Sequence, residues 1–408
     1  MIKSIKEAKV IGIKTYLIIG FLSLLIGLVV GTVDFIFGIV LLELGSFRTD
    51  HLLYLLPFLA PIGLIIVYLY KHYGKKASKG MALLFLIDQK EEKELPLILI
   101  PLVIVTTWLT HLFGGSAGRE GVAVQIGATI SHYFHSFVRV ENASKIFLVV
   151  GMSAGFAGLF QTPMAAVLFA LEVLVLDHMV FIALVPAVLA AFTSSMTTQA
   201  LGLEKFSISL TGQLSMTPLL LLKFLLLGIV FGLVGNLFAI SLSALKTLFA
   251  DKVRNAYWRI ACIGLIISLA ILLLHQGRYS GLGTNLIASV FSHQEVYSYD
   301  WLLKLIFTVL TIAAGYQGGE VTPLFAIGAS LGCVLAPILG LPVLLCAALG
   351  YCAVFASATN TFLTPVFIGL EVFGGSQTSA FFLVVAISYM LNRKASIYPF
   401  QKIAESRE

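Results

Sequence analysis

Charged residues are scarce in this chain. Of its 408 residues, 26 are Lys or Arg and 20 are Asp or Glu, which makes 11% charged, whereas 59% are hydrophobic. Soluble domains carry roughly a quarter charged residues, so the composition excludes a soluble enzyme. The mean hydropathy is +1.00, and it is spread along the chain. We therefore predict an all-α integral membrane protein, with only residues 1–15 and 393–408 polar enough to lie outside the bilayer.

Residues with the spacing of a metal site or a catalytic centre are also lacking. Four cysteines lie in apolar runs without metal-ligand spacing: Cys262, Cys333, Cys346 and Cys352. We expect these to be packing residues, and we expect no metal and no cofactor. Ser116 and Ser153 lie near glycines but lack a plausible histidine partner, and His111 is expected to be a hydrogen-bonded or interfacial imidazole. The sequence thus favours a transporter over an intramembrane enzyme.

The positive charges are confined to short loops. A net charge of +6 would suit nucleic acid only if the cations shared one surface, so no such partner is expected. Lys and Arg instead mark cytoplasmic loops. They gather before residue 16, at 71–79, at 252–259 and after 392, which predicts cytoplasmic termini and an even number of crossings. The connections at 48–51 and 279–300 are assigned to the outer face, and the run 16–47 is too long for a cleavable signal peptide.

Many apolar runs are interrupted. A plain helix needs about 20 apolar residues to cross the bilayer, and five runs qualify: 16–47, 52–70, 179–203, 217–250 and 257–275. Other runs are short and bounded by Gly, Pro, Ser or Thr: 121–134, 144–160, 163–176, 302–316, 323–339 and 360–374. Because bare backbone is not tolerated in lipid, these short helices predict a wet or protein-lined site inside the membrane.

The interruptions recur at half the chain length. Residues 126–130 (IGATI) return as 327–331 (IGASL) at an offset of 201, and 151–173 align with 350–372 at an offset of 199 with 9 of 23 identities. Two nearly equal offsets predict a duplicated architecture, by which many transporters place a site at the bilayer midplane. We assign residues 16–203 to the first half and 204–392 to the second. The repeat alone leaves open whether one half is inverted.

Six acidic residues lie in or beside apolar runs: Asp34, Glu43, Glu120, Glu172, Glu320 and Glu371. A charge at a helix centre costs ~2.5–3.5 kcal/mol on insertion scales, so each acid needs water, a partner or a proton. Glu172 and Glu371 occupy equivalent repeat positions, which favours a structural role at a helix end or a subunit contact over transport. Asp34 and Glu43 have no counterpart and stay unassigned.

Glu120 ends a glycine-rich loop, Gly114-Gly115-Ser116-Ala117-Gly118-Arg119-Glu120, just before a helical run that starts at Val122. Loop N–H groups and the amino end of a helix together form an anion cradle. A carboxylate can occupy this cradle when charged and leave it when protonated, which predicts a gate that also carries protons. The alternative is a helix cap without a transport role.

Glu320 lies in the corresponding break of the second half, Gly318-Gly319-Glu320-Val321-Thr322-Pro323. Proline suits the start of a helix, and the free N–H groups of Val321 and Thr322 are expected to face the same cavity. Two helix amino ends, one from each half, would then make one anion site. An ion pair between Glu320 and a distant Lys or Arg is the alternative.

These motifs resemble those of the CLC family of anion channels and anion/proton antiporters. Gly118-Arg119-Glu120-Gly121 is similar to the family's G-(K/R)-E-G-P signature, with Val122 replacing proline, and 319–323 is similar to G-x-F-x-P, with Val321 replacing the aromatic residue. Met81 stands where the family has an anion-binding serine. Tyr398 stands where it has the phenol that closes the inner end of the anion path. The resemblance extends from about residue 16 to about residue 400.

The departures from these signatures resemble the bacterial fluoride/proton antiporter branch of the family. They are Met81, the sequence Glu320-Val321-Thr322, the lack of a cytoplasmic regulatory domain, and Val173 in place of the second acid that chloride/proton exchangers carry after Glu172. The resemblance implies a CLC-type fold of two inverted helical halves with many short, tilted and broken helices. It also implies a homodimer with one pathway per subunit in the bacterial inner membrane.

The implied function is export of cytoplasmic fluoride in exchange for inward protons. The resemblance implies that Glu120 gates the path and couples protons, and that Glu320 is a central proton-linked residue. It implies anion binding by Met81, Gly118, Arg119, Gly121, Val122, Val321, Thr322 and Tyr398. Short, well-directed donors suit fluoride because it is small and tightly hydrated. The alternative is a chloride/proton exchanger or a passive anion channel on the same fold.

Overall fold

The computed structural model describes residues 12–140, 142–176, 181–212, 215–392 and 394–403. Residues 1–11 of the N-terminal segment 1–15, which we predict to be a cytoplasmic amphipathic segment, lie outside this part of the chain. Helices dominate the described residues, and two short strands, β1 (Val175–Leu176) and β2 (Lys402–Ile403), pair in parallel. The predicted all-α fold class is confirmed, with β2 as a small addition in the C-terminal tail.

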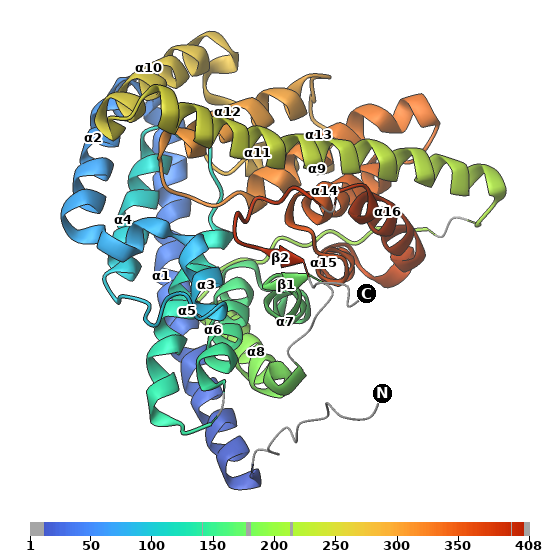
Figure 1. Ribbon diagram of the computed structural model, residues 1–408. Coiled ribbons are helices and arrows are strands. Elements are labelled where there is room, and N and C mark those ends of the chain that lie inside the picture. The colour runs from blue at the N-terminus through green and yellow to red at the C-terminus, as the bar shows by residue number, and fades with distance from the viewer. Residues whose placement is uncertain (1–11, 141, 177–180, 213–214, 393, 404–408) are drawn as a thin grey trace.

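The helices before residue 203 are α1 (Ile13–Leu55), α2 (Leu59–Leu69), α3 (Met81–Asp88), α4 (Leu99–Leu112), α5 (Glu120–Tyr133), α6 (Ala143–Phe160), α7 (Pro163–Glu172) and α8 (Leu184–Ala200). Those that follow are α9 (Pro218–Lys252), α10 (Ala256–Leu273), α11 (Thr284–Phe291), α12 (Asp300–Ala314), α13 (Val321–Leu339), α14 (Val343–Thr359), α15 (Leu363–Phe373) and α16 (Thr378–Leu391). In Figure 1 most of the first set lies in the left and lower parts of the view and most of the second in the upper and right parts. The two sets meet at β1, β2, α7 and α15, and also where α10 lies beside α2.

The short apolar runs of the sequence are short helices in the structure. α5, α6, α7, α13 and α15 each begin and end within four residues of the predicted run. Of the 18 residues of α6, 89% are buried inside the protein. This helix is therefore surrounded by other helices rather than by lipid. Within the described residues, six helical stretches are long and apolar enough to cross a membrane.

The predicted connection at 48–51 contains a kink at which two helical stretches of α1 join. α1 continues to Leu55, and only His51, with φ −121° and ψ 22°, departs from helical geometry. Side chains bond to the carbonyl one turn back, from Thr49 to Gly45 and between His51 and Phe47. The break between the two helical stretches therefore lies at His51, and a short 3-10 helix at 56–58 leads into α2.

The sequence repeat corresponds to a structural repeat. α6 and α14 both end at a residue in the left-handed region, Gln161 with φ 55° and Asn360 with φ 53°, which are 199 residues apart. Helix contacts repeat as well. A Cβ on Gly127 would lie 2.2 Å from the Gly151 carbonyl oxygen, and one on Gly328 would lie 2.0 Å from that of Gly350. These small residues let α5 approach α6 closely, and they let α13 approach α14 in the same way.

Glu172 and Glu371 cap each other's helices. Glu172, the last residue of α7, accepts backbone bonds from Phe362, Leu363 and Thr364 at the amino end of α15, at 2.6, 2.9 and 3.1 Å. Glu371, near the end of α15, accepts bonds from the amides of Met164 and Ala165 at the start of α7, at 3.2 and 2.8 Å. Each carboxylate satisfies N–H groups that the helix leaves free. The predicted structural role of this pair is confirmed.

The two unassigned acids have different surroundings. Glu43 is exposed on α1, whereas Asp34 is fully buried. Both Asp34 carboxyl oxygens lack a hydrogen-bond partner among the described residues. One of them packs against α6, because a Cβ on Gly158 would lie 2.6 Å from Asp34 Oδ2.

Candidate anion and proton site

The two glycine-rich breaks meet at the centre of the molecule. Gly118 donates its N–H to the Gly319 carbonyl at 2.5 Å, and Gly319 donates to the Gly118 carbonyl at 2.8 Å, in an antiparallel bridge. These residues are 201 apart, the offset of the repeat. Equivalent residues that exchange both bonds are related by a local two-fold axis, so the breaks of the two halves face each other around one point.

Glu120 reaches across this junction to the second half. One of its carboxylate oxygens, Oε2, accepts the Thr322 N–H at 3.1 Å and the Thr322 hydroxyl at 2.5 Å. The side chain is 1% exposed. Thr322 is the second residue of α13, so its amide is one of the free N–H groups at a helix amino end, where negative charge is favoured. The carboxylate thus sits in a cradle for an anion, and the main donors come from the opposite half rather than from its own loop.

Arg119 provides the positive charge beside this carboxylate. Its backbone N–H donates to Glu120 Oε2 at 3.3 Å, and its Nε lies 3.7 Å from Oε1. Two guanidinium nitrogens, Nε and Nη1, are buried without a hydrogen-bond partner in the described part of the chain. Buried donors without partners are costly, and an anion next to Glu120 would satisfy them.

Glu320 lies next to the anion donors but does not bind Thr322. It is the residue before α13, and its side chain is partly exposed. A Cβ on Gly121 would lie 3.9 Å from Glu320 Oε2, so this acid faces the start of α5. Glu320 is not among the ion pairs of the described residues. A tight structural ion pair is therefore not what holds it.

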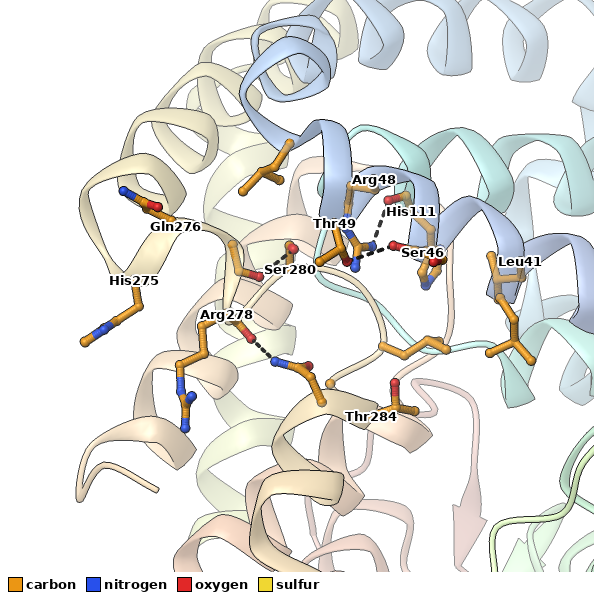
Figure 2. Close-up of a pocket in the computed structure, with 17 residues that line it drawn as sticks. Leu41, Ser46, Arg48, Thr49, His111, His275, Gln276, Arg278, Ser280 and Thr284 are labelled. Atoms are coloured by element: carbon orange, nitrogen blue, oxygen red, sulfur yellow. Dashed lines mark hydrogen bonds between the residues drawn. The ribbon is translucent and has the colours of Figure 1, made fainter. Parts of the chain in front are cut away.

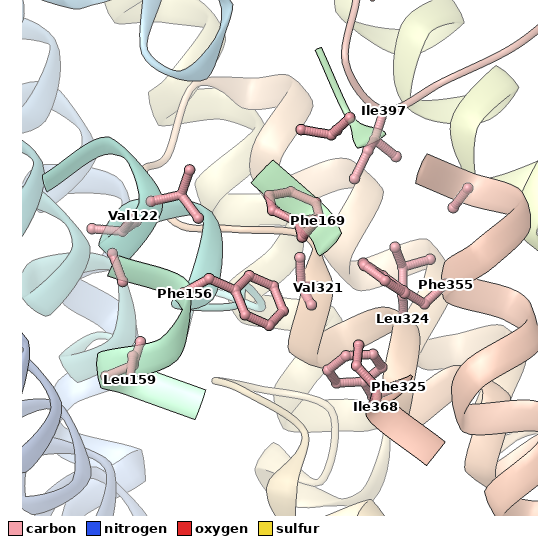
Figure 3. Close-up of a cluster of buried hydrophobic side chains, with 14 of the residues drawn as sticks. Val122, Phe156, Leu159, Phe169, Val321, Leu324, Phe325, Phe355, Ile368 and Ile397 are labelled. Carbon is pink, nitrogen blue, oxygen red and sulfur yellow. The ribbon is translucent and has the colours of Figure 1, made fainter. Parts of the chain in front are cut away.

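Val122 and Val321, the two replacements in the signatures, are buried in an apolar cluster beside the cradle. Figure 3 shows them with Phe156, Phe169 and Phe325, which come from α6, α7 and α13. The rings of Phe156 and Phe169 stack at 5.0 Å. Such surroundings exclude water and strengthen the electrostatic interactions of the nearby carboxylate.

Tyr398 and Met81 lie on another side of the site. The Tyr398 ring is 5.4 Å from that of Phe85 on α3 and 6.3 Å from that of Phe169. Met81 begins α3, one turn before Phe85. Tyr398 lines a cavity of about 440 Å³ together with residues of α9 and the C-terminal segment. The structure does not bring Met81 into the hydrogen-bonded group of Glu120 and Thr322.

Sequence reasoning missed a buried lysine next to the glycine-rich loop that ends at Glu120. Lys304 on α12 is 0% exposed and donates to the Ser116 hydroxyl at 2.9 Å, the Gly281 carbonyl at 2.7 Å and the Tyr279 carbonyl at 3.2 Å. Ser116 also bonds to Thr308 at 2.9 Å. The only sequence signal was a single cation inside the apolar run 302–316. His111 is hydrogen-bonded as predicted: its ring nitrogens lie 2.8 and 2.9 Å from the carbonyl oxygens of Thr107 and Ala117, and the nitrogen that carries the proton donates to one of them.

Comparison with known proteins agrees with this geometry. The family model described as "Voltage gated chloride channel" matches residues 62–393. The chain belongs to the voltage-gated chloride channel (CLC) family. It is 34% identical over 392 residues to a "Chloride/fluoride channel protein" of Pseudomonas syringae pv. tomato, a match that covers 94% of this chain and 86% of that protein.

Solved CLC structures share the whole architecture. One is described as a CLC-type fluoride/proton antiporter and is similar at a TM-score of 0.94 with 54% sequence identity, covering 95% of this chain and 98% of that one. Another, described as a slow cyanobacterial Cl⁻/H⁺ antiporter, has a TM-score of 0.78 at 19% identity and covers 92% and 94% of the two chains. The second likeness shows the fold alone. The predicted CLC-type fold and family resemblance are confirmed.

Proposed function

We propose that this CLC protein is a fluoride/proton antiporter that exports cytoplasmic fluoride in exchange for inward protons. The observation that carries the proposal is the Glu120 carboxylate held by the amide and hydroxyl of Thr322 at the amino end of α13. A free anion can replace this carboxylate, and a proton on Glu120 releases it. One cradle therefore serves both ions in turn. The relatives whose names include fluoride support the choice of anion.

The donors at this site fit a small, tightly hydrated anion. Dehydration of fluoride has to be offset by short, directed hydrogen bonds. The Thr322 hydroxyl already makes a bond of 2.5 Å to a carboxylate oxygen, and the Arg119 guanidinium has unfilled donors close by. The residues Gly118, Gly121, Val122 and Val321 shape the backbone and the dry wall of this cradle. Met81 offers a thioether, which fills space without adding a strong donor.

Proton transfer to the inner side is assigned to Glu320. Valine at 173 replaces the second acid of chloride/proton exchangers, and Glu320 is a partly exposed carboxylate next to Thr322. In the proposed cycle Glu120 takes a proton from outside, moves inward and releases it, while Glu320 and Thr322 stabilise the inner position. Tyr398, which lines the cavity of about 440 Å³, stands between this position and the inner end of the path.

We further propose that the protein is a homodimer with one pathway per subunit in the bacterial inner membrane, with both termini cytoplasmic. The cation-rich loops at 71–79 and 252–259 support this orientation. The bridge between Gly118 and Gly319 supports a division into halves at about residue 204.

The deciding experiment is ion flux from liposomes that contain the purified protein. Vesicles are loaded with fluoride or chloride, and the released anion and the external pH are recorded together. We expect fluoride efflux with stoichiometric proton uptake and far slower chloride efflux. Chloride exchange with equal proton coupling would favour a chloride/proton exchanger. Anion flux without proton movement would identify a channel. Vesicles with Glu120→Gln protein are the control for coupled flux.

A further inference from the structure

A second cavity, of about 450 Å³, lies behind the glycine-rich loop 114–120, which is called the gate loop below. The cavity is partly open and is bordered by the C-terminal part of α1, the end of α4 and the chain from the end of α10 to the start of α11 (Figure 2). Arg48, His111, Arg278 and Ser280 are among its seventeen lining residues, and none of the seventeen is Asp or Glu. The volume is enough for an anion together with several waters, which occupy about 30 Å³ each in the liquid.

Arg48 gives this cavity an uncompensated positive charge. Its Nη1 donates to the His111 carbonyl at 3.0 Å, and Arg48 is not part of any ion pair in the described residues. Arg278 differs, because its Nη2 lies 2.7 Å from Asp300 Oδ2. That carboxylate also raises the pKa of Arg278. Arg48 thus has free N–H donors on its planar guanidinium group, a geometry suited to anions. The charge of Arg278, by contrast, is already neutralised by Asp300.

The Arg48 side chain is fixed against the gate loop through Gly281. A Cβ on Gly281 would lie 2.4 Å from Arg48 Nη1, so the guanidinium packs directly on this glycine. Gly281 donates to the Gly115 carbonyl at 2.9 Å, and its own carbonyl accepts the Ala117 N–H at 3.2 Å. A single residue therefore separates the guanidinium from the loop that carries Glu120.

Lys304 adds a second charge on the other side of Gly281. It donates to the same Gly281 carbonyl at 2.7 Å, and its three bonds to oxygen atoms match the three donors of a protonated amine. Lys304 also forms no ion pair in this part of the structure. Two like charges held together near a cavity without acids attract an anion into it.

We propose that this cavity is an anion-binding site distinct from the Glu120 cradle, in which Arg48 contacts a small hydrated anion and Lys304 reinforces the positive potential. Its size fits an anion that keeps part of its water, so the site does not discriminate strongly among halides. In the transport cycle it receives the anion that Glu120 displaces. Only the identification of that anion as fluoride rests on the proposed function.

The potential of the cavity is tested with a cysteine reporter. Ser46, which lines the cavity, is replaced as Ser46→Cys in a background with Cys262→Ser and Cys333→Ser, since the two remaining cysteines are buried. Anionic and cationic thiosulfonate reagents are applied, and each rate is normalised to the reaction with free cysteine. We expect the anionic reagent to react about tenfold faster than the cationic one. Adding Arg48→Gln removes this preference, whereas Arg48→Lys retains most of it. Lys71→Gln, which removes a cation outside the cavity, leaves it unchanged.

Occupancy by an anion is tested in the same protein. Replacing gluconate by sodium fluoride or sodium chloride at equal ionic strength should slow modification of Ser46→Cys severalfold, and the protection should be lost with Arg48→Gln. If the Arg48→Gln variant does not fold, the test uses two other proteins. Halides should slow the modification of Ser46→Cys both in the protein that keeps Arg48 and in the Arg48→Lys variant. Equal rates for both reagents, or no protection by either halide, would overturn the proposal. Halide protection in a protein that fails to exchange fluoride for protons would support the site while removing the proposed function.

Discussion

The hydroxyl and the amide of Thr322 both donate to one oxygen of Glu120, although 202 residues separate the two in the chain. The gate carboxylate is thus held by the half of the protein to which it does not belong. In the proposed cycle the anion that displaces Glu120 uses the same donors. Both the anion and the Glu120 carboxylate would then depend on Thr322.

Replacing Thr322 with valine should weaken fluoride binding. The variant keeps the backbone amide and the shape of the side chain but loses the hydroxyl donor. We expect the Kd for fluoride, measured by titration calorimetry, to rise about tenfold, which corresponds to about 1.4 kcal/mol for a hydrogen bond to a charged group. Thr322→Ser should remain close to the parent protein.

A matched control for this variant is Thr364→Val. Thr364 also donates its amide and its hydroxyl to a glutamate, in this case Glu172, at 3.1 and 2.8 Å. This pair holds a helix end and does not face the proposed anion site. Thr364→Val should therefore leave the Kd unchanged. Equal losses of affinity in the two variants would argue that Thr322 acts only on stability.

Glu120→Gln should abolish coupled exchange. Glutamine keeps the shape of the side chain but cannot take up and release a proton, so the gate can no longer alternate with the anion. Simultaneous recording of fluoride and pH in liposomes should show no proton movement driven by a fluoride gradient. A Glu120→Gln protein that still pumped protons against fluoride would refute the assignment.

Glu320→Gln is expected to separate anion movement from proton movement. The side chain is partly exposed and lies beside the donors of Thr322 without bonding to them, so its loss leaves the cradle in place. Fluoride binding should persist, whereas proton flux under a fluoride gradient should disappear. Undiminished proton flux would exclude Glu320 from the proton path and direct attention to other acids, such as the buried Asp34.

Local features of the fold could be predicted from the sequence because they depend on local chemistry. The glycine, proline and serine boundaries of the apolar runs place the ends of α5, α6, α7 and α13 within a few residues. The repeated Leu-Glu-Val at 171–173 and 370–372 indicated a structural pair, and the structure shows reciprocal caps. The composition predicted a membrane protein because so few charges cannot cover a soluble surface.

Features that depend on long-range packing could not be predicted. The donors to Glu120 come mainly from α13, and no local pattern specifies which half supplies them. The break at His51 takes a single non-helical residue, so α1 continues to Leu55, and an apolar count does not register this. Lys304 can be buried because each of its N–H donors has an acceptor. The acceptors belong to Ser116, Tyr279 and Gly281, which come together around it from other parts of the chain.

Glu172→Gln and Glu371→Gln should destabilise the protein rather than alter ion selectivity. Each carboxylate accepts N–H groups at the start of the partner helix, and an amide offers one weaker oxygen acceptor in place of two charged ones. We expect a loss of about 1–3 kcal/mol per variant, seen as a lower midpoint of thermal unfolding in detergent. Glu172→Gln should be the more harmful, because Glu172 accepts three backbone N–H groups and one hydroxyl, against two N–H groups for Glu371. Glu43→Gln, on the exposed face of α1, provides the control and should not shift the midpoint. A changed fluoride-to-chloride flux ratio with an unchanged midpoint would show instead that these acids act on the transported ion.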